Sequence, residues 1–121
     1  MRYKNKQLHI ACDGGAATGK STAAKMVSKK FNLKFLSSGL LYRYASYLIL
    51  KYSPNNKTSF LRRKFKNLKY KQIEKLQLHT IKISEHSSII AKNKNIRKIL
   101  KDFQISFSKN NKKCCIEGRD I

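Results

Sequence analysis

Apolar residues along the chain fall into short extended runs and longer stretches with helical spacing. Three short runs have the character of strands: residues 7–12, 34–36 and 113–117. Stretches with helical spacing are expected to form helices over residues 19–31, from Leu41 to just before Ser53, and over residues 79–92 and 95–107. Residues 57–77 show a weaker, basic pattern, which predicts helix in pieces.

The helical stretches predict which side chains face the core. The expected buried stripes are Ala23, Met26, Val27 and Phe31; Leu41, Tyr44, Ala45 and Leu48; and Ile96, Ile99, Leu100, Phe103 and Phe107. Asn32 is a candidate stop for the first helix, and residues 53–56, which include the only proline, read as a loop. Strand, helix, strand and a later strand predict an α/β fold with a small parallel sheet of about three strands and helices on both faces.

The charge is strongly positive, with 28 Lys and Arg against 6 Asp and Glu, a net charge of +22. Lysines account for 22 of the basic residues and are scattered from Lys4 to Lys113, whereas arginine, which suits planar phosphate recognition, is scarce. We interpret the excess as a compositional bias with non-specific affinity for polyanions at low salt, and expect no specific nucleic-acid partner.

Length and cysteine usage favour one domain of a cytoplasmic protein. The 121 residues suffice for a modest core, and they contain no apolar run long enough to cross a membrane and no signal-peptide pattern. Cys12, Cys114 and Cys115 lack the spacing of a metal or redox motif, so we expect them to be small buried hydrophobes.

Three of the six acidic residues stand at predicted strand ends. Asp13 follows the first strand, and Glu117 and Asp120 flank a Gly-Arg pair after the last one. An α/β protein places its chemistry at the carboxyl ends of parallel strands, so these carboxylates are candidate site residues.

A Gly-rich segment after the first strand fits the phosphate-binding pattern G-x-x-x-x-G-K-[ST]. Its expected phosphate-binding residues are Gly14, Gly15, Ala16, Ala17, Thr18, Gly19, Lys20, Ser21 and Thr22. Glycines let successive N–H groups converge on one anion, and the helix that follows directs its N-terminus at phosphate. Lys20 is expected to reach the β- and γ-phosphates of ATP, and the Ser21 hydroxyl to ligate Mg²⁺.

Two further motifs restrict which nucleotide the protein is expected to bind. Residues 37–43 read SSGLLYR and residues 116–121 read IEGRDI. With the Gly-rich segment, they resemble the bacterial-type cytidylate kinase family, densely over residues 10–46 and again from about residue 78. The resemblance implies a three-layer P-loop NTPase fold and covers only the N-terminal half of the family, so we expect a C-terminally truncated chain without the lid.

The family implies a division into three parts and a set of site residues. The parts are a nucleotide-binding core over residues 1–52, a reduced substrate-binding insert over 53–93, and a return to the core over 94–121. By resemblance, Ser38, Arg43 and Arg119 bind the phosphate of CMP or dCMP, and Ser88, Arg97 and Asp120 read the cytosine edge. Lys20 and Arg119 are the expected catalytic residues, and Glu117 is expected to orient a metal-bound water.

The implied reaction transfers the γ-phosphoryl group of ATP to CMP or dCMP, in a monomer. Gly15, Ser37 and His79 depart from the family pattern, which usually has Pro, Asp and Arg there. The alternatives are another P-loop kinase of adenylate or shikimate type, and a basic nucleic-acid-binding module with a vestigial P-loop. The 121-residue chain by itself is expected to show little turnover.

Overall fold

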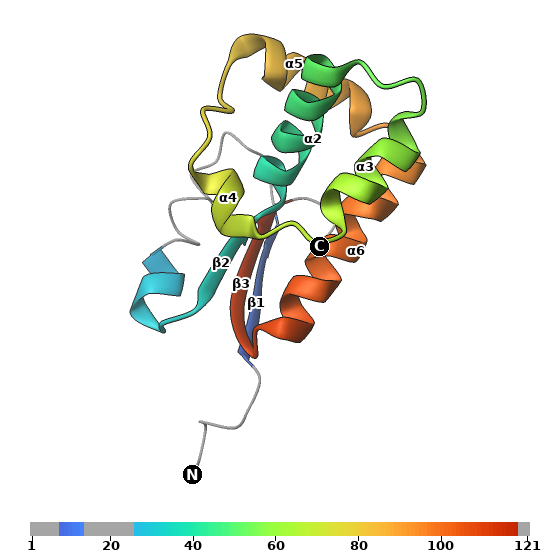
Figure 1. Cartoon of the computed structure of the whole chain (residues 1–121). Helices are drawn as coiled ribbons and strands as arrows, with labels where there is room; N and C mark the ends of the chain where they lie inside the picture. The colour runs from blue at the N-terminus through green and yellow to red at the C-terminus, as the bar shows by residue number, and fades with distance from the viewer. Residues whose placement is uncertain (1–7, 14–25, 119–121) are drawn as a thin grey trace. The chain divides into compact units, whose positions relative to one another are not determined.

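The structure, a computed structural model, describes residues 26–118 and the backbone of residues 8–13. The described chain divides into two compact units (Figure 1). The first unit contains the described residues up to Gly39 and from Gln104 onward, and the second contains residues 40–103. The functional division at residues 52 and 93 that the sequence suggests stays a prediction.

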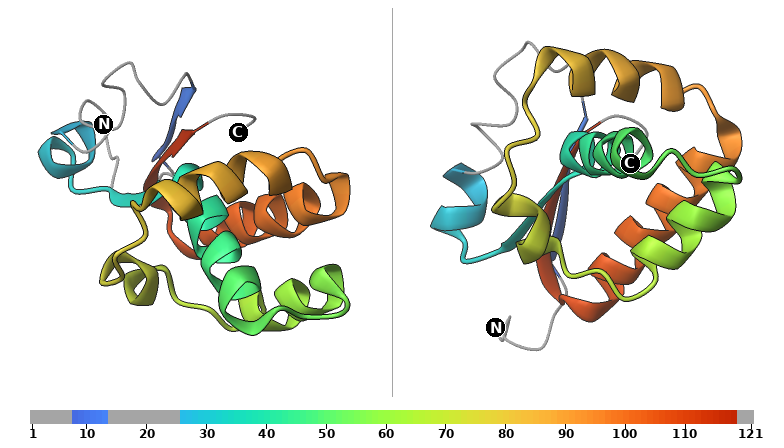
Figure 2. Two further views of the ribbon diagram at one scale, coloured as in Figure 1. Left: turned by 90° about the horizontal axis from the view of Figure 1, so that it is seen from above. Right: turned by 45° about the horizontal axis from the view of Figure 1, so that its top comes forward.

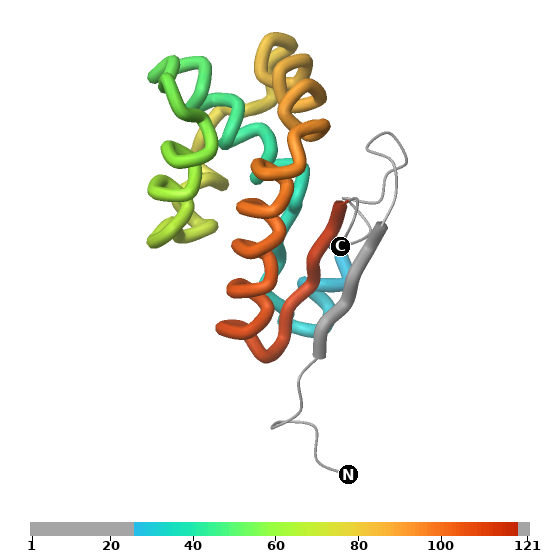
Figure 3. The backbone as a smooth tube through the Cα atoms, turned by 90° about the vertical axis from the view of Figure 1, so that its right-hand side faces the viewer, coloured from blue at the N-terminus to red at the C-terminus, as the bar shows by residue number. Residues whose placement is uncertain are grey.

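The first unit contains a three-stranded parallel sheet. Its strands are β1 (Leu8–Asp13), β2 (Lys34–Ser37) and β3 (Lys113–Gly118), in the spatial order β1-β3-β2. Figure 3 shows the chain turning from the preceding helix directly into β3. All three strands lie within a residue of the positions expected from the sequence, which confirms a small parallel α/β sheet.

Strand β3 is central and is covered on both faces. Cys114 and Cys115 are fully buried, and successive side chains of a strand point to opposite faces of the sheet. On one face Cys115 packs with Leu33, against which Val27 and Phe35 also lie. The expectation that these two cysteines act as small buried hydrophobes is confirmed, whereas the side chain of Cys12 lies outside the described residues.

The short helix at residues 26–30 ends in a Schellman motif. Asn32 adopts the left-handed conformation, with φ of 54°. The Leu33 amide donates to the Ser28 carbonyl at 2.7 Å, and the Asn32 amide donates to the Lys29 carbonyl at 3.4 Å. Asn32 is therefore the stop that the sequence predicts.

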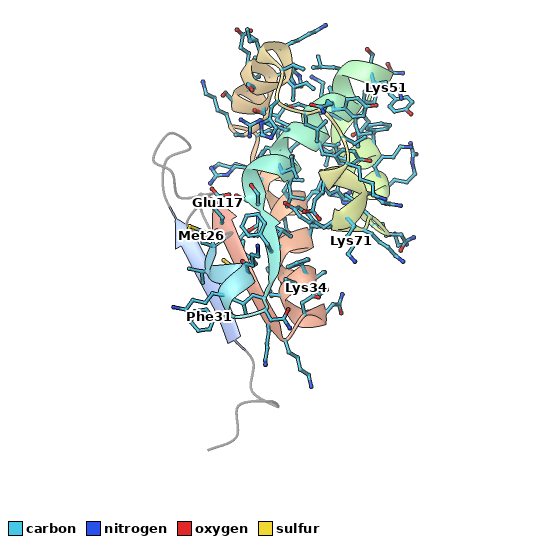
Figure 4. All side chains as sticks on the ribbon, turned by 90° about the vertical axis from the view of Figure 1, so that its left-hand side faces the viewer. Met26, Phe31, Lys34, Lys51, Lys71 and Glu117 are labelled. Carbon is cyan, nitrogen blue, oxygen red and sulfur yellow. The ribbon has the colours of Figure 1, made fainter. Side chains whose placement is uncertain are left out.

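The predicted buried face of this helix is partly wrong. Met26 is 67% exposed and Phe31 is 52% exposed, while Ser28, which is not a member of the predicted stripe, is 5% exposed. Figure 4 labels Met26 and Phe31 on this short segment. Phe31 lies in the turn after the helix, where helical spacing no longer decides its direction. Ala23 and the rest of residues 19–25 lie outside the described part of the chain.

The second unit is built from helices. The helices that contribute to it are α2 (Ser38–Tyr52), α3 (Lys57–Phe65), α4 (Tyr70–Glu74), α5 (Ile81–Ile90) and α6 (Lys94–Asn110). Helices α2 and α6 continue into it from the first unit. In Figure 2, α2 runs through the middle of the other helices. These bounds confirm the expected helices, including two separate pieces within residues 57–77.

Two predicted stripes are confirmed in most of their positions. On α2, Leu41, Ala45 and Leu48 are buried, together with Ile49, and on α6, Ile96, Ile99 and Leu100 are buried. The predicted members Tyr44, Phe103 and Phe107 are half-buried. Aromatic rings extend this core. The Phe65 ring meets Tyr44 and Phe103 edge to face, with centroid distances of 5.7 and 5.8 Å. Such pairs add to the free energy gained by burial of the rings.

Three helices begin at polar residues whose side chains accept backbone hydrogen bonds. Asn56 Oδ1 accepts from the Ser59 amide at 3.0 Å, and Thr80 Oγ1 accepts from the Ile83 amide at 3.2 Å. Asn93 Oδ1 accepts from the amides of residues 95 and 96 at 2.9 and 3.1 Å. These side chains satisfy donors that the helix leaves without a partner, and so fix where each helix starts.

Candidate functional site

The carboxyl ends of the three strands define the candidate site. Strand β3 pairs with β1 so that Cys12 lies opposite Glu117 and Asp13 opposite Gly118, and it pairs with β2 so that Ser37 lies opposite Glu117. Figure 4 shows Glu117 near this end of β3. The register therefore brings Asp13 and Glu117 to one edge of the sheet, as their positions in the sequence predict.

Gly118 and Ser38 approach each other closely at this edge. Ser38 is the first residue of α2 and is 2% exposed. A side-chain carbon on residue 118 would overlap the Ser38 hydroxyl and lie 2.7 Å from the Ser38 Cβ. Gly118 also has φ of 148°, a conformation that residues with a side chain rarely adopt. Only glycine at residue 118 lets β3 end against the start of α2.

Chain connectivity brings the two other motifs to the same edge. Gly14, the first residue of the Gly-rich segment, follows directly on Asp13 at the end of β1, and Arg119 follows directly on Gly118. The predicted phosphate-binding residues 14–22 and the predicted substrate residues Arg119 and Asp120 themselves lie outside the described residues. Their roles stay predictions.

Arg43 presents a buried donor without a partner. It lies in the second turn of α2, whose first residue is Ser38. Its Nε is buried and has no hydrogen-bond partner among the described residues. A buried guanidinium nitrogen of this kind costs free energy unless an acceptor reaches it. A phosphate oxygen would be such an acceptor.

Tyr42 lies close to Arg97 within the second unit. Burial raises the pKa of the Tyr42 hydroxyl above its usual value, and the nearby Arg97 guanidinium lowers that pKa in part. The Tyr42 hydroxyl is therefore protonated at neutral pH. Arg97 lies in the first turn of α6, whose start is fixed by the Asn93 cap.

Ser88 lies on α5, whereas Arg43 lies on α2 and Arg97 on α6. It is exposed on α5, and its hydroxyl donates to the Ser84 carbonyl one turn earlier at 3.3 Å. The structure therefore places Arg43, Arg97 and Ser88 in the second unit and Ser38 in the first. A single site formed by all four residues stays a prediction.

The described part of the chain contains neither a metal-ligating cluster nor a membrane-spanning helix. Residues 26–118 contain no group of three or more His, Cys, Asp or Glu side chains arranged to hold a metal ion. No helix in that part of the chain is long and apolar enough to cross a membrane. Glu117, which is 8% exposed, is the carboxylate at the sheet edge whose side chain the structure describes.

Two relationships at the site were not foreseen from the sequence. The sequence places Tyr42 inside the SSGLLYR motif but gives no sign that it lies close to Arg97, which comes 55 positions later in the chain. The contact between Gly118 and Ser38 was likewise missed, although both residues stand in motifs. The only signal was that Ser38, Tyr42 and Gly118 belong to motifs already singled out.

Comparison with known proteins agrees with the motifs. Residues 10–121 match the family model described as Cytidylate kinase. A cytidylate kinase from Mesomycoplasma hyopneumoniae (strain 232) is 35% identical, with 95% of this chain and 56% of that protein covered. A cytidylate kinase from Clostridioides difficile (strain 630) is 33% identical, with 94% and 57% covered. One from Bartonella tribocorum is 34% identical, with 96% and 54% covered. The chain thus spans about half the length of the curated relatives it matches.

Proposed function

The chain belongs to the cytidylate kinase family, and on this premise we propose that it transfers the γ-phosphoryl group of ATP to CMP or dCMP, giving ADP and CDP or dCDP. The fold we propose is the three-layer P-loop NTPase fold, of which the described parallel sheet and helices form part. The proposed partners are small molecules, ATP with CMP or dCMP, and no specific nucleic acid.

The register at the carboxyl edge of the sheet is the observation that carries this proposal. It sets Asp13 beside Gly118, while Ser38 begins α2 against Gly118. Donor-binding and acceptor-binding motifs therefore leave the sheet from the same edge. In-line transfer between two nucleotides requires their phosphates to meet in this way.

The proposed chemistry rests on positioning and charge neutralisation. The acceptor phosphate of CMP is anionic near neutral pH, so the reaction needs no strong general base. Lys20 would hold the donor phosphates, and Arg119 the acceptor. Ser38 and Arg43 would bind the CMP phosphate, which would give the buried Arg43 Nε an acceptor that the described residues do not supply.

Cytosine recognition is assigned to Arg97, Ser88 and Asp120. Cytosine offers an amino donor, which a carboxylate or hydroxyl accepts, and its N3 and O2 accept from a guanidinium. Uracil carries a hydrogen on N3 and an oxygen in place of the amino group. The same residues would therefore be mispaired with uracil, and buried mispaired groups discriminate strongly between substrates.

The residue types proposed for the site fit Mg²⁺ as the cofactor. Mg²⁺ in phosphoryl-transfer sites is held by one or two protein oxygens together with phosphates and waters. The hydroxyl of Ser21 and the carboxylate of Glu117, the latter buried at the end of β3, are hard oxygen donors of this kind. When bound, the ion would neutralise charge on the transferring phosphoryl group. Glu117 would orient a water in its coordination shell.

A binding and turnover panel tests the proposal. Calorimetry with the 121-residue chain should give tighter binding of CMP and dCMP than of UMP, AMP or shikimate. Lys20→Ala should weaken ATP binding and leave CMP binding intact. ADP release in a coupled assay, which we expect to be slow for this chain by itself, should depend on CMP or dCMP as acceptor. Tightest binding of AMP or shikimate, or preferential turnover of either, would contradict the proposal.

A further inference from the structure

A cluster of cations surrounds two aromatic rings where α2 ends and α3 follows along the chain. It consists of Lys51 and Tyr52 on α2 and of Phe60, Arg63 and Lys64 on α3, all within the second unit, and we call it the cationic patch. We propose that the cationic patch binds single-stranded nucleic acid independently of base sequence. This binding goes beyond the proposed kinase activity and does not depend on it.

The two rings of the patch gather its three cations in one place. The Lys51 and Lys64 ammoniums lie 5.4 and 5.3 Å from the centre of the Tyr52 ring. Lys64 also lies 5.7 Å from the centre of the Phe60 ring, and the Arg63 guanidinium lies 5.8 Å from it. The two ring centres are 5.7 Å apart. All these distances fall within about 6 Å, the range in which a ring attracts a cation. Figure 4 labels Lys51 at the surface of the second unit.

Acidic side chains do not offset these charges within the described part of the chain. The sequence contains no Asp or Glu between Asp13 and Glu74. None of the three cations forms an ion pair within residues 26–118, where an ion pair does join Lys98 and Asp102. Like charges at such short range repel each other, and binding of an anion relieves this repulsion. The patch is therefore suited to a negatively charged partner.

A compositional bias toward lysine does not account for the arginine in the patch. The chain has 22 lysines and only 6 arginines, yet Arg62 and Arg63 stand side by side in the last turn of α3, where both are exposed. The proposed kinase site uses neither of them. Arginine suits phosphate, because its planar guanidinium donates two N–H groups to two oxygens of one phosphate. Phosphate is therefore the anionic group that the patch fits best.

The exposed ring of the patch favours a single strand over a duplex. Tyr52 is 51% exposed, whereas Phe60 is 8% exposed. Bases of a single strand are free to stack on an exposed aromatic side chain, while the bases of a duplex stack on each other. The cations beside Tyr52 can then contact the phosphates on either side of a stacked base. Contacts of these kinds read no base edge, so the binding does not depend on sequence.

An anionic membrane fits the patch less well. A protein that lies on a membrane inserts exposed apolar side chains between the lipid headgroups, next to its basic residues. In and beside the patch, Phe60 and Leu61 are buried, and the exposed ring of Tyr52 carries a hydroxyl. The patch therefore offers charge to a membrane but little apolar surface for insertion.

Fluorescence anisotropy with labelled poly(U) RNA of about 20 nucleotides tests the proposal. Poly(U) contains no cytosine, and excess ATP and CMP occupy the proposed kinase site, so neither nucleotide should change RNA binding. At about 0.15 M salt, charges more than about 8 Å apart are largely screened. We expect the triple variant Lys51→Gln, Arg63→Gln, Lys64→Gln to weaken binding at least about tenfold. The slope of log affinity against log salt should fall by up to about 2, because three phosphate contacts are lost.

A matched triple variant controls for total charge. Lys109→Gln, Lys112→Gln, Lys113→Gln removes the same charge from exposed lysines around the end of α6 and the start of β3, and should change RNA affinity by less than about twofold. Tyr52→Ala should weaken binding about fivefold or more through loss of stacking, and Tyr52→Phe should retain binding. Circular dichroism checks that each variant is folded, and calorimetry should give unchanged CMP affinity in all of them.

The outcomes separate the patch from its alternatives. Equal loss of RNA affinity in the two triple variants would overturn the proposal, because only total charge would then matter. Tighter binding of a poly(A)–poly(U) duplex, or of phosphatidylserine vesicles, would overturn the single-stranded partner. Release of poly(U) by ATP and CMP would place the RNA at the kinase site and overturn the role of the patch. Absence of CMP binding by the wild-type chain would contradict the proposed kinase function alone, since the RNA measurements decide the role of the patch.

Discussion

Gly118 ends the central strand against Ser38, the first residue of α2, with no room for a side chain between them. Gly118 belongs to the Gly-Arg-Asp motif, and Ser38 belongs to the Ser-Gly motif that follows β2. The close approach fixes where the chain segment carrying Arg119 leaves the sheet. Gly118 and Ser38, which are 80 positions apart in the sequence, thus fix the end of β3 relative to the start of α2.

Gly118→Ala should destabilise the fold. The new methyl group would overlap the Ser38 hydroxyl, and alanine would be forced into φ near 148°. Strain and overlap of this kind predict a loss of about 2–4 kcal/mol in the free energy of unfolding. Urea denaturation followed by circular dichroism measures the loss.

Two variants isolate the cause of this effect. Gly39→Ala is the control, because Gly39 lies within α2. It should alter the free energy of unfolding by less than about 1 kcal/mol. Ser38→Gly in the Gly118→Ala background should restore part of the loss, because it removes the overlap and leaves the backbone strain. A Gly118→Ala protein as stable as the wild type would show that this approach is not close in solution.

The sequence was sufficient to predict the strands and helices, but it did not predict correctly which face of every helix is buried. The strands were predictable because each is a short apolar run followed by Gly or Ser, and the stripes on α2 and α6 because those helices are long. The helix at residues 26–30 is short and turns at Asn32, so Phe31 leaves the helical pattern. Over so few residues, helical spacing predicts poorly which side chains are buried.

The placement of Asp13 and Glu117 at one edge of the sheet was predictable for a different reason. Asp13 and Glu117 stand where parallel strands end, and topology alone brings such positions together. The proximity of Tyr42 to Arg97 depends on how α2 and α6 pack in three dimensions. No local pattern encodes that packing, so this proximity could not be predicted from the sequence.

His86 should make the stability of the protein depend on pH. Burial lowers its pKa below the ordinary value of 6.5, and the nearby Lys57 charge lowers it further. The unfolded chain therefore binds more protons than the folded one at mildly acidic pH, so the free energy of unfolding should fall as pH drops through about 6.5. One such group limits the slope to about 1.4 kcal/mol per pH unit.

Thermal unfolding between pH 8 and pH 5 tests this dependence. His86→Gln should flatten the curve, because the titrating group is removed. His79→Gln is the matched control, since His79 is exposed before the start of α5, and it should leave the curve unchanged. An unchanged slope in His86→Gln would assign the pH dependence to other groups.

Asn93→Ala should destabilise α6 by removing its cap. The side-chain oxygen of Asn93 accepts from two backbone amides, at 2.9 and 3.1 Å, and alanine cannot replace it. Loss of a helix cap predicts a decrease of about 1 kcal/mol in the free energy of unfolding. Asp102→Asn, which breaks the exposed ion pair with Lys98 on the same helix, should cost less than about 0.5 kcal/mol. Urea unfolding of both variants provides the comparison, and equal losses would contradict the capping role.

Arg43→Met should separate stability from substrate binding. Without ligand, the buried Arg43 Nε has no partner among the described residues, so its removal should leave the free energy of unfolding unchanged or raise it by about 1 kcal/mol. Binding of CMP should weaken at least about tenfold, because a charge-assisted contact to phosphate is lost. Arg63→Met is the control: Arg63 is exposed on α3 above the Phe60 ring, at 5.8 Å, and its loss should leave CMP binding unchanged. Calorimetry measures the CMP affinity of both variants, and urea unfolding measures their free energy of unfolding. Reduced stability of Arg43→Met together with unchanged CMP affinity would identify Arg43 as a packing residue and remove it from the substrate site.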